Sequence, residues 1–314
     1  MRLVLKADAS PVLGAGHVMR SLAIAEEAIS RNIDTFFAGT ISDADWLYEK
    51  TKSVPGLLWI DNLESFVVDP KRDFLLLDSY SLPLDCAFIK PSRWKCVIAI
   101  VDQLTPSYEA NLKIHPGLVH GHHTLSNVLS GPNYIPLRKT ITKSQKVESV
   151  PLKVIVVGGG TNIHKVVNFI ASELQHLEFE FQTFLFSEQI DDKLLVDARF
   201  ERVPIGADLD AIAEEADLVF TTASTTSMEF IAREKAVGVT CAVDNQREYY
   251  LALTESGLAA PIGVFENHVW NLNSQVIRQL VLDKKYRENL IKRTENLIDL
   301  QGSKRIVDKI ISML

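Results

Sequence analysis

The feature that most constrains the fold is an alternation of short apolar runs with longer segments of helical periodicity, which occurs twice along the chain. Such runs are typical of parallel strands buried on both faces and joined by helices. Strands are predicted at residues 3–6, 35–38, 57–60, 74–78, 97–101, 153–157, 181–186, 201–204, 218–221 and 236–242. Helices are predicted at residues 18–30, 43–52, 162–174, 209–214, 226–233 and 247–256. The pattern therefore predicts an α/β protein with two doubly wound sheets.

The predicted boundary lies where the alternation is interrupted. Residues 102–137 carry Gly, Pro, Asn and four histidines, so we expect irregular structure there. Residues 139–151 are mostly polar and end at Pro151, which is typical of a linker. We therefore expect an N-terminal domain over 1–138 and a C-terminal domain over 152–298, with a ligand cleft between them. The charged segment 273–314 is predicted to be helical, with 299–314 crossing back to the first domain.

The composition excludes collagen, coiled coils and small disulfide-rich scaffolds. With 314 residues, 46% hydrophobic and 23% charged, the chain has room for two ordinary domains. Its net charge of -7 argues against nucleic acid as a partner. No stretch approaches a membrane span, and the start lacks a signal-peptide pattern, so we expect a cytoplasmic protein without stable membrane insertion. We also expect a monomer or a weak oligomer. Three scattered cysteines, Cys86, Cys96 and Cys241, are expected to be buried and reduced.

The first candidate site is the Gly14-Ala15-Gly16-His17 motif, which follows the first strand and opens the first helix. Glycines allow a close approach of the backbone to a ligand, and free N–H groups at a helix start favour an anion. The motif is not GxGxxG, so dinucleotide binding is weakly supported. The helix dipole favours a neutral imidazole, so His17 is a candidate general base, although capping alone is the alternative. Asp8 and Ser10 either orient His17 or a water, or only form the turn.

Three further motifs follow strands of the second domain. Gly158-Gly159-Gly160 precedes a helix and can accept a phosphate or simply form a tight turn. The hydroxyl-rich run 221–227 offers donors to a diphosphate, and Glu229 can bind a ribose diol, although Thr226 and Glu229 also have the spacing of a capping box. The run 244–246 can bind sugar hydroxyls or cap a helix. The motifs together indicate a phosphorylated small molecule as ligand.

A metal site is not expected. His115, His120, His122 and His123 lie close in sequence, but their spacing fits no standard zinc pattern, and neither Cys nor paired carboxylates accompany them. A solvated loop is the prediction for these histidines. No metal and no cofactor are therefore expected.

The motifs, taken in order, resemble a known family. The chain contains KADASPVLGAGHVMRSLAIA, LLLDSY, VDQ, GPNYIPLR, VVGGGTN, ASTTSMEF and DNQRE between residue 6 and about residue 250. This set is similar to the UDP-2,4-diacetamido-2,4,6-trideoxy-β-L-altropyranose hydrolases of pseudaminic acid biosynthesis and their spore-coat-polysaccharide relatives. The resemblance implies a GT-B architecture, with two Rossmann-like domains and an interdomain cleft. Segment 111–117 departs from the family pattern, which leaves the sugar open.

The resemblance also implies roles for individual residues. His17 is the base that activates water, and Tyr80 lies near the sugar. Asp8, which lies upstream on the loop of His17, is kept from the residue pattern itself as a third catalytic candidate. The remaining residues are expected to bind the UDP-sugar: Gly14, Gly16, Arg20, Gly159, Gly160, Thr161, Val203, Ile205, Ser224, Thr225, Thr226, Glu229, Asn245 and Gln246. Of these, the glycine turn and residues 224–226 would face the diphosphate, Glu229 the ribose, and residues 203–205 the uracil.

Three functions are consistent with these residues. In the first, water activated by His17 attacks the anomeric carbon of a UDP-diacetamido-trideoxyhexose, and UDP leaves with inversion. In the second, a glycosyltransferase uses a sugar or lipid hydroxyl in place of water. In the third, the chain is a noncatalytic nucleotide-sugar binding paralogue. Turnover without an acceptor, turnover only with an acceptor, or binding without turnover distinguishes them.

Overall fold

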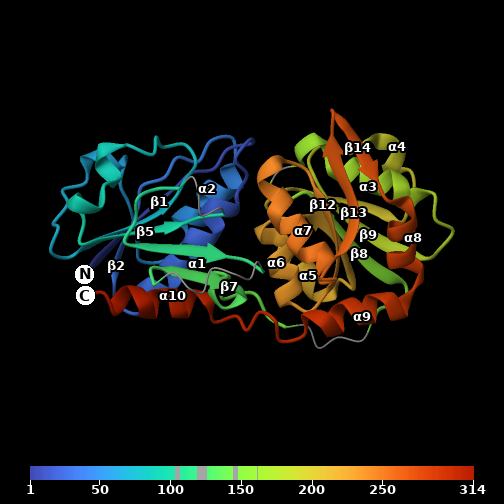
Figure 1. Cartoon of the computed structure of the whole chain (residues 1–314). Helices are drawn as coiled ribbons and strands as arrows, with labels where there is room; N and C mark the ends of the chain where they lie inside the picture. The colour runs from blue at the N-terminus through green and yellow to red at the C-terminus, as the bar shows by residue number, and fades with distance from the viewer. Residues whose placement is uncertain (103–106, 119–125, 144–147, 161) are drawn as a thin grey trace. The chain divides into compact units, whose positions relative to one another are not determined.

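The computed structural model describes residues 1–102, 107–118, 126–143, 148–160 and 162–314. The chain forms two compact units, each with its own sheet (Figure 1). Unit 1 comprises Met1–Lys139 and Asp299–Leu314, and unit 2 comprises Thr140–Ile298. The last segment of the chain therefore returns to the unit in which the chain begins.

The sheet of unit 1 has seven parallel strands in the order β3-β2-β1-β4-β5-β6-β7. The strands are β1 (Arg2–Ala7), β2 (Asp34–Phe37), β3 (Leu57–Trp59), β4 (Asp73–Asp78), β5 (Cys96–Ile100), β6 (Leu112–Pro116) and β7 (Val128–Gly131). The central strands β1 and β4 are apolar and buried on both faces, as a helix-covered parallel sheet requires. The carboxyl ends of β1 and β4 therefore lie side by side.

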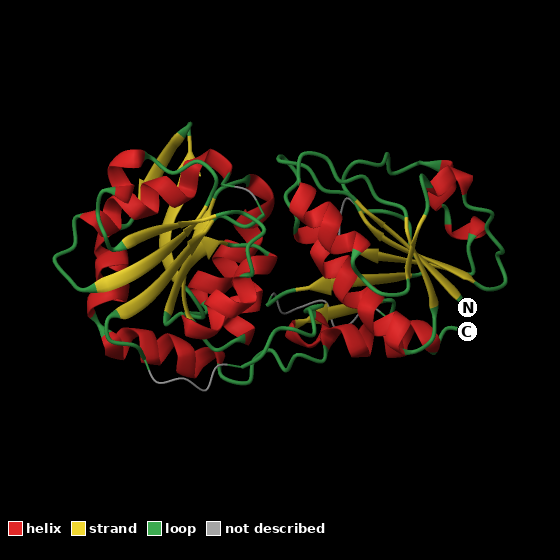
Figure 2. Ribbon diagram, turned by 180° about the vertical axis from the view of Figure 1, so that it is seen from behind, coloured by secondary structure: helices red, strands yellow, loops and turns green. Residues whose placement is uncertain are grey.

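Helices cover the sheet of unit 1, and apolar side chains are buried on both of its faces (Figure 2). They are α1 (Gly16–Ser30), α2 (Asp45–Lys52) and α10 (Gly302–Ile311), with short 3-10 helices at Leu63–Ser65, Ala87–Ile89, Pro91–Arg93 and Pro132–Tyr134. Helix α10 packs against α1 and buries Ile306, Val307 and Ile310. Gly302 begins α10 so close to the backbone of Ile135 that an added Cβ would lie 2.0 Å from its carbonyl oxygen. Helix α10 is thus an integral part of the core of unit 1.

The sheet of unit 2 has the order β10-β9-β8-β11-β12-β13-β14, parallel except for the β13–β14 hairpin. Its strands are β8 (Leu152–Val157), β9 (Phe181–Phe186), β10 (Phe200–Val203), β11 (Leu218–Thr222), β12 (Ala236–Cys241), β13 (Ala260–Glu266) and β14 (Val269–Leu272). Its helices are α3 (Val166–Gln175), α4 (Asp192–Leu195), α5 (Leu209–Glu215), α6 (Thr225–Ala232), α7 (Arg247–Glu255), α8 (Ser274–Leu282) and α9 (Lys284–Thr294), with 3-10 turns at Ile163–Lys165 and Asp244–Gln246. The loops after β8, β10, β11 and β12 share one edge of this sheet.

The ten predicted strands are confirmed to within about two residues, whereas several other predictions are wrong. The segment 102–137 is not wholly irregular, because β6 and β7 extend the sheet there. Strands β13 and β14 have no counterpart among the predicted elements. The helix expected from residue 162 begins at Val166, because His164 and Lys165 have left-handed backbone angles. The predicted helical segment 273–314 is divided into α8, α9 and α10.

Two predictions about individual side chains also need correction. His115 does not lie in a solvated loop but is buried on β6, while His120, His122 and His123 lie outside the described residues. Cys96 and Cys241 are buried as expected, but Cys86 is only half-buried, and all three thiols are free. Among the described residues, no helix is both long enough and apolar enough to span a membrane.

Candidate active site

His17 is the second residue of α1 and is placed by the loop that follows β1. Gly14 has a φ of +74°, a left-handed conformation that favours glycine, and its amide donates to the carbonyl of Ser10 at 2.8 Å. The hydroxyl of Ser10 accepts from the amide of Leu13, so Ser10 forms the turn. The side chain of His17 is buried, with 9% exposed. The loop therefore presents an imidazole from the first turn of a helix.

Asp78 ends β4 and holds the imidazole of His17. Oδ1 of Asp78 lies 2.7 Å from Nδ1 of His17, and the carboxylate is 1% exposed. Because an ionised carboxylate only accepts hydrogen bonds, the proton of a neutral His17 resides on Nδ1. The lone pair of Nε2 is then available to take a proton from a reacting group, as in the imidazole–carboxylate pair of hydrolytic triads. The geometry therefore equips His17 to act as a general base.

Arg20, one turn further along α1, joins Asp78 to Asp102, which follows β5. Its Nε donates to Oδ2 of Asp78 at 2.6 Å and its Nη1 to Oδ1 of Asp102 at 2.6 Å. Burial by itself lowers the pKa of Arg20, but the charges of Asp102 and Asp78 outweigh it and raise the pKa well above its ordinary value. Burial likewise raises the pKa of Asp102, and the Arg20 guanidinium overcomes this and holds the pKa far below its usual range. Both members of the pair stay charged.

Tyr80 closes one side of this cluster. Its ring meets the imidazole of His17 edge-on, with the ring centroids 4.6 Å apart, and its hydroxyl donates to the carboxylate of Asp102. Burial, and next the negative charge of Asp102, raise the pKa of Tyr80 above its ordinary value. The phenol therefore stays protonated and acts as a hydrogen-bond donor. Tyr80 therefore lies beside His17, and its position near the sugar stays a prediction.

Asp8 does not orient His17, contrary to one of the alternatives considered for it. Its carboxylate accepts from the Lys6 ammonium at 2.5 Å, from the Thr40 amide at 2.8 Å, and from the Ser79 and Ser81 hydroxyls at 2.8 and 2.6 Å. Burial alone would raise the pKa of Asp8, but the hydrogen bonds from Lys6 and Ser81 lower it below its ordinary value. Asp8 therefore ties together the loops that follow β1, β2 and β4.

His115, Asp78 and Asp102 are the residues of this cluster to which the sequence assigned no role. Nε2 of His115 donates to the main-chain carbonyl of Asp102 at 3.0 Å, and its Nδ1 lies 3.4 Å from the Ser130 hydroxyl. The available signal was that both aspartates directly follow buried apolar runs. In a parallel sheet such positions gather at one edge, where α1 also begins.

In unit 2, the glycine turn after β8 lies beside the end of β11. Gly159 has a φ of +90°, and a Cβ there would come within 3.7 Å of the Thr222 hydroxyl. Gly160 follows in the same turn, and Thr161 lies outside the described residues. Asn162 then anchors α3, since its side chain accepts from the amide of Val167 at 2.9 Å. The structure thus brings together the glycine turn and the hydroxyl run.

The hydroxyl run caps α6, with a register different from the predicted one. The capping box forms between Ser224 and Ser227, whose Oγ accepts from the Ser224 amide at 3.2 Å, rather than between Thr226 and Glu229. Thr225 and Thr226 are the first two residues of α6, so their amides have no acceptor within the helix. Glu229 is buried on the same helix, with 8% exposed. The start of α6 therefore offers main-chain donors.

The other predicted nucleotide residues also lie along this edge of unit 2. Val203 ends β10, and the amide of Ile205 donates to Glu188 at 3.0 Å. Gln246 accepts from the amide of Ala242 at 2.9 Å, so it braces the turn after β12, whereas Asn245 is exposed. These positions lie at the ends of β10 and β12, which are separated in the sheet by β9, β8 and β11.

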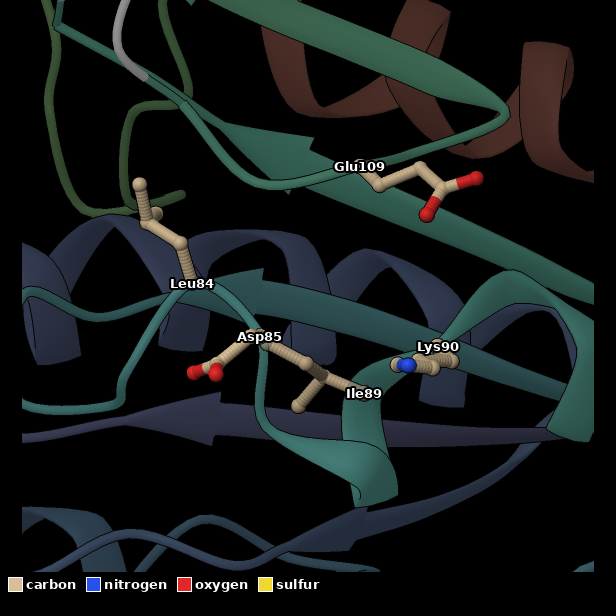
Figure 3. A pocket seen from close by; sticks show the side chains of 5 residues that line it. All are labelled: Leu84, Asp85, Ile89, Lys90 and Glu109. Atoms are coloured by element: carbon tan, nitrogen blue, oxygen red, sulfur yellow. The ribbon is translucent and has the colours of Figure 1, made fainter.

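A separate hollow of about 260 Å³ lies on unit 1 and is lined by Leu84, Asp85, Ile89, Lys90 and Glu109 (Figure 3). None of the predicted site residues lines it.

Within the described part of the chain, no group of three or more His, Cys, Asp or Glu side chains is arranged to hold a metal ion.

Comparison with solved structures shows the fold. MurG from Acinetobacter baumannii matches with a TM-score of 0.65 and 15% identity, over 99% of this chain and 100% of that one. TcCGT1, solved in complex with UDP, matches with a TM-score of 0.69 and 10% identity, over 100% and 99%. The calicheamicin glycosyltransferase CalG4 matches with a TM-score of 0.61 and 14% identity, over 100% and 98%. The chain has the GT-B fold. No family model and no curated protein sequence matches it.

Proposed function

We propose that the chain is a nucleotide-sugar enzyme in which His17 removes a proton from the group that attacks the anomeric carbon of the sugar. The observation that carries the proposal is the 2.7 Å contact between Nδ1 of His17 and the Asp78 carboxylate. This contact leaves Nε2 as the proton acceptor and stabilises the imidazolium that forms. The GT-B fold, which glycosyltransferases share, supports this class of reaction.

The proposed step is a single displacement. An oxygen of the acceptor forms a bond to C1 of the sugar while its proton passes to Nε2 of His17. The bond from C1 to the phosphate oxygen breaks, and UDP leaves with the electron pair, which inverts the configuration at C1. A diphosphate is a good leaving group, so the acid that most glycosidases need is not required. Donors at helix N-termini would stabilise its charge.

The nucleotide is proposed to bind at the edge of the unit 2 sheet. The glycine turn at 158–160 and the amides of Thr225 and Thr226 would face the diphosphate, Glu229 the ribose, and the backbone at 203–205 the uracil. Asn245 and Gln246 would face the sugar or phosphate. That TcCGT1, which has the same fold, is solved with UDP supports a uridine nucleotide.

Two acceptors are consistent with this chemistry, and different observations favour them. The similar solved structures include glycosyltransferases, which favours a hydroxyl of a sugar or lipid. The ordered motifs around His17, Asp78 and Asp102 resemble the hydrolases of pseudaminic acid biosynthesis, which favours water and a UDP-2,4-diacetamido-2,4,6-trideoxyhexose. Both acceptors give up a proton to the same base.

The test is incubation with UDP-2,4-diacetamido-trideoxyhexoses and UDP-N-acetylglucosamine, with and without acceptors, scoring UDP and sugar products. Release of free sugar without an acceptor identifies a hydrolase, and product only with an acceptor identifies a transferase. In ¹⁸O-labelled water, hydrolysis by the proposed step places the label in the sugar. His17→Asn, which keeps a donor towards Asp78 but lacks Nε2, should abolish turnover and keep UDP binding. Turnover at the wild-type rate in this variant would refute the proposal.

A further inference from the structure

We propose that Arg20 and Asp102 are positioning residues that lock the Asp78–His17 pair, and that Arg20 is therefore not a ligand of the diphosphate. The inference rests on the proposed function, in which His17 is the base. It reassigns a basic residue that sequence alone places among the substrate ligands. It also gives a role to Asp102, which accepts hydrogen bonds from Arg20 and Tyr80, the two neighbours of His17.

The first support is the saturation of the Arg20 guanidinium. Nε and Nη2 grip the two oxygens of Asp78 at 2.6 and 2.7 Å, which is a bidentate pair. Nη1 and Nη2 reach the two oxygens of Asp102 at 2.6 and 3.4 Å. Every nitrogen of the guanidinium is thus engaged, and the side chain is only 7% exposed. Turning Arg20 towards a phosphate would take the guanidinium charge away from two buried carboxylates, which is destabilising.

The second support is geometric. A bidentate pair fixes the plane of a carboxylate, so Arg20 determines where Oδ1 of Asp78 points. That oxygen is the one that meets Nδ1 of His17. Nη2 of Arg20 also lies 3.1 Å from Nδ1, too close to leave the imidazole free to rotate past it. The guanidinium therefore fixes the orientation of the base through Asp78.

The third support is the balance of charge. With a neutral imidazole, the cluster holds one cation, Arg20, and two anions, Asp78 and Asp102. Proton uptake by His17 then neutralises the excess negative charge instead of building charge in a buried site, where unpaired charge is costly. Tyr80, which stays protonated, adds no charge and donates to Asp102. Asp102 thus supplies the second anion of the cluster, which balances the charge that His17 gains when it takes the proton in the proposed step.

Asp102 is itself held on two sides. The Tyr80 hydroxyl donates to its carboxylate, and Nε2 of His115 donates to its main-chain carbonyl. His115 is 1% exposed and lies on β6, within the sheet. A chain of hydrogen bonds therefore connects His115 in the sheet through Asp102, Arg20 and Asp78 to His17.

The test reads the tautomer of His17 by NMR of protein with ¹⁵N-labelled histidine, with the signal assigned by its loss in His17→Asn. Wild type should show a protonated Nδ1 and an unprotonated Nε2. Arg20→Lys and Asp102→Asn should each lower the population of this tautomer. They should also lower kcat by about 10- to 100-fold, the cost of a misplaced group, while UDP affinity changes less than about twofold. If Arg20→Lys does not fold, the test rests on Asp102→Asn, which keeps the shape of the side chain. An unchanged His17 tautomer in Asp102→Asn would then contradict the positioning role.

A different pattern of UDP affinity and His17 tautomer would overturn the inference. A loss of UDP affinity of about tenfold or more in Arg20→Lys, with the tautomer of His17 unchanged, would overturn the inference and make Arg20 a phosphate ligand. The tautomer and the UDP affinity are both measured without turnover. A chain that binds UDP but neither hydrolyses a UDP-sugar nor transfers its sugar would contradict the proposed function. The spectra and the UDP affinity would still decide between a positioning role and a phosphate-binding role for Arg20.

Discussion

Nδ1 of His17 lies 2.7 Å from Oδ1 of Asp78, although 61 positions separate the two residues in the sequence. The contact exists because β1 and β4 are neighbours in the sheet, so the loop after β1 and the end of β4 meet at one edge. Helix α1 then turns His17 towards that edge. The pair is therefore a direct product of the strand order.

Replacing Asp78 with Asn tests the chemical role of this pair. An amide can donate to Nδ1, which an ionised carboxylate cannot, so the tautomer that protonates Nε2 and removes the base becomes available. We expect kcat to fall by about 100- to 10,000-fold, the usual range for loss of general base catalysis. UDP affinity, measured by calorimetry, should hardly change because unit 2 carries the proposed nucleotide residues.

The exposed residue Lys304 offers a matched control on the same unit, and Lys304→Ala should turn over at the wild-type rate. Full activity in Asp78→Asn would contradict the role of the carboxylate. Equal loss of activity and of folded protein, judged by circular dichroism, would mean that Asp78 is only structural.

How far the sequence predicts this site depends on whether a signal is local. His17 is predictable because two glycines, a strand and a helix start surround it within a few positions. Asp78 and Asp102 each end an apolar run, but their partners are set by strand order, which no local pattern contains. Arg20 illustrates the consequence: a basic residue near a candidate anion site suggests a phosphate ligand, whereas the sheet supplies it with two carboxylates.

The same reasoning explains why β6 and β7 are missing from the prediction. Strands such as β4, with the sequence DFLLLD, are apolar and buried along their length and are therefore visible in the sequence. Strand β6 reads LKIHP, with Lys, His and Pro in five residues, and β7 has only four residues. These two strands are recognised only by their pairing with β5 and with each other.

Tyr80→Phe removes the hydroxyl of Tyr80 and keeps its ring, so it tests the contribution of the hydroxyl alone. The hydroxyl donates to Asp102 and is not placed to exchange a proton with His17, while the ring packs against the imidazole. We expect kcat to fall by less than about tenfold in Tyr80→Phe, since one hydrogen bond at a half-exposed residue is worth about 1 kcal/mol. Tyr80→Ala, which also removes the ring contact, should lose more. Complete loss of turnover in Tyr80→Phe would instead make the phenol an acid in the reaction.

The acid stability of unit 1 should depend on Asp8. The pKa of Asp8 is lowered in the folded protein, so its ion pair with Lys6 contributes fully above the unfolded value of about 3.9 and is lost as pH falls through the folded value. Asp8→Asn should therefore be less stable than wild type at pH 6. The difference should shrink as the pH is lowered from about 5 towards 3.

This difference is measurable by urea unfolding monitored by tryptophan fluorescence. Trp46, Trp59 and Trp94 lie in unit 1, and only Trp270 lies in unit 2, so the signal reports mainly on unit 1. A stability difference between wild type and Asp8→Asn that stays constant from pH 6 to pH 3 would contradict the lowered pKa.

Helix α10 should stabilise unit 1 rather than unit 2. Ile306 is fully buried in the core that α10 forms with α1, although it lies near the C-terminus of the chain. Ile306→Ala removes its buried methyl and methylene groups and leaves a cavity, so we expect unit 1 to lose about 2–5 kcal/mol of unfolding free energy. Lys304→Ala, on the same helix but exposed, should change it by less than about 0.5 kcal/mol. Because unit 2 has its own core, UDP binding should survive Ile306→Ala. If UDP binding is lost when unit 1 unfolds, the two units do not fold independently.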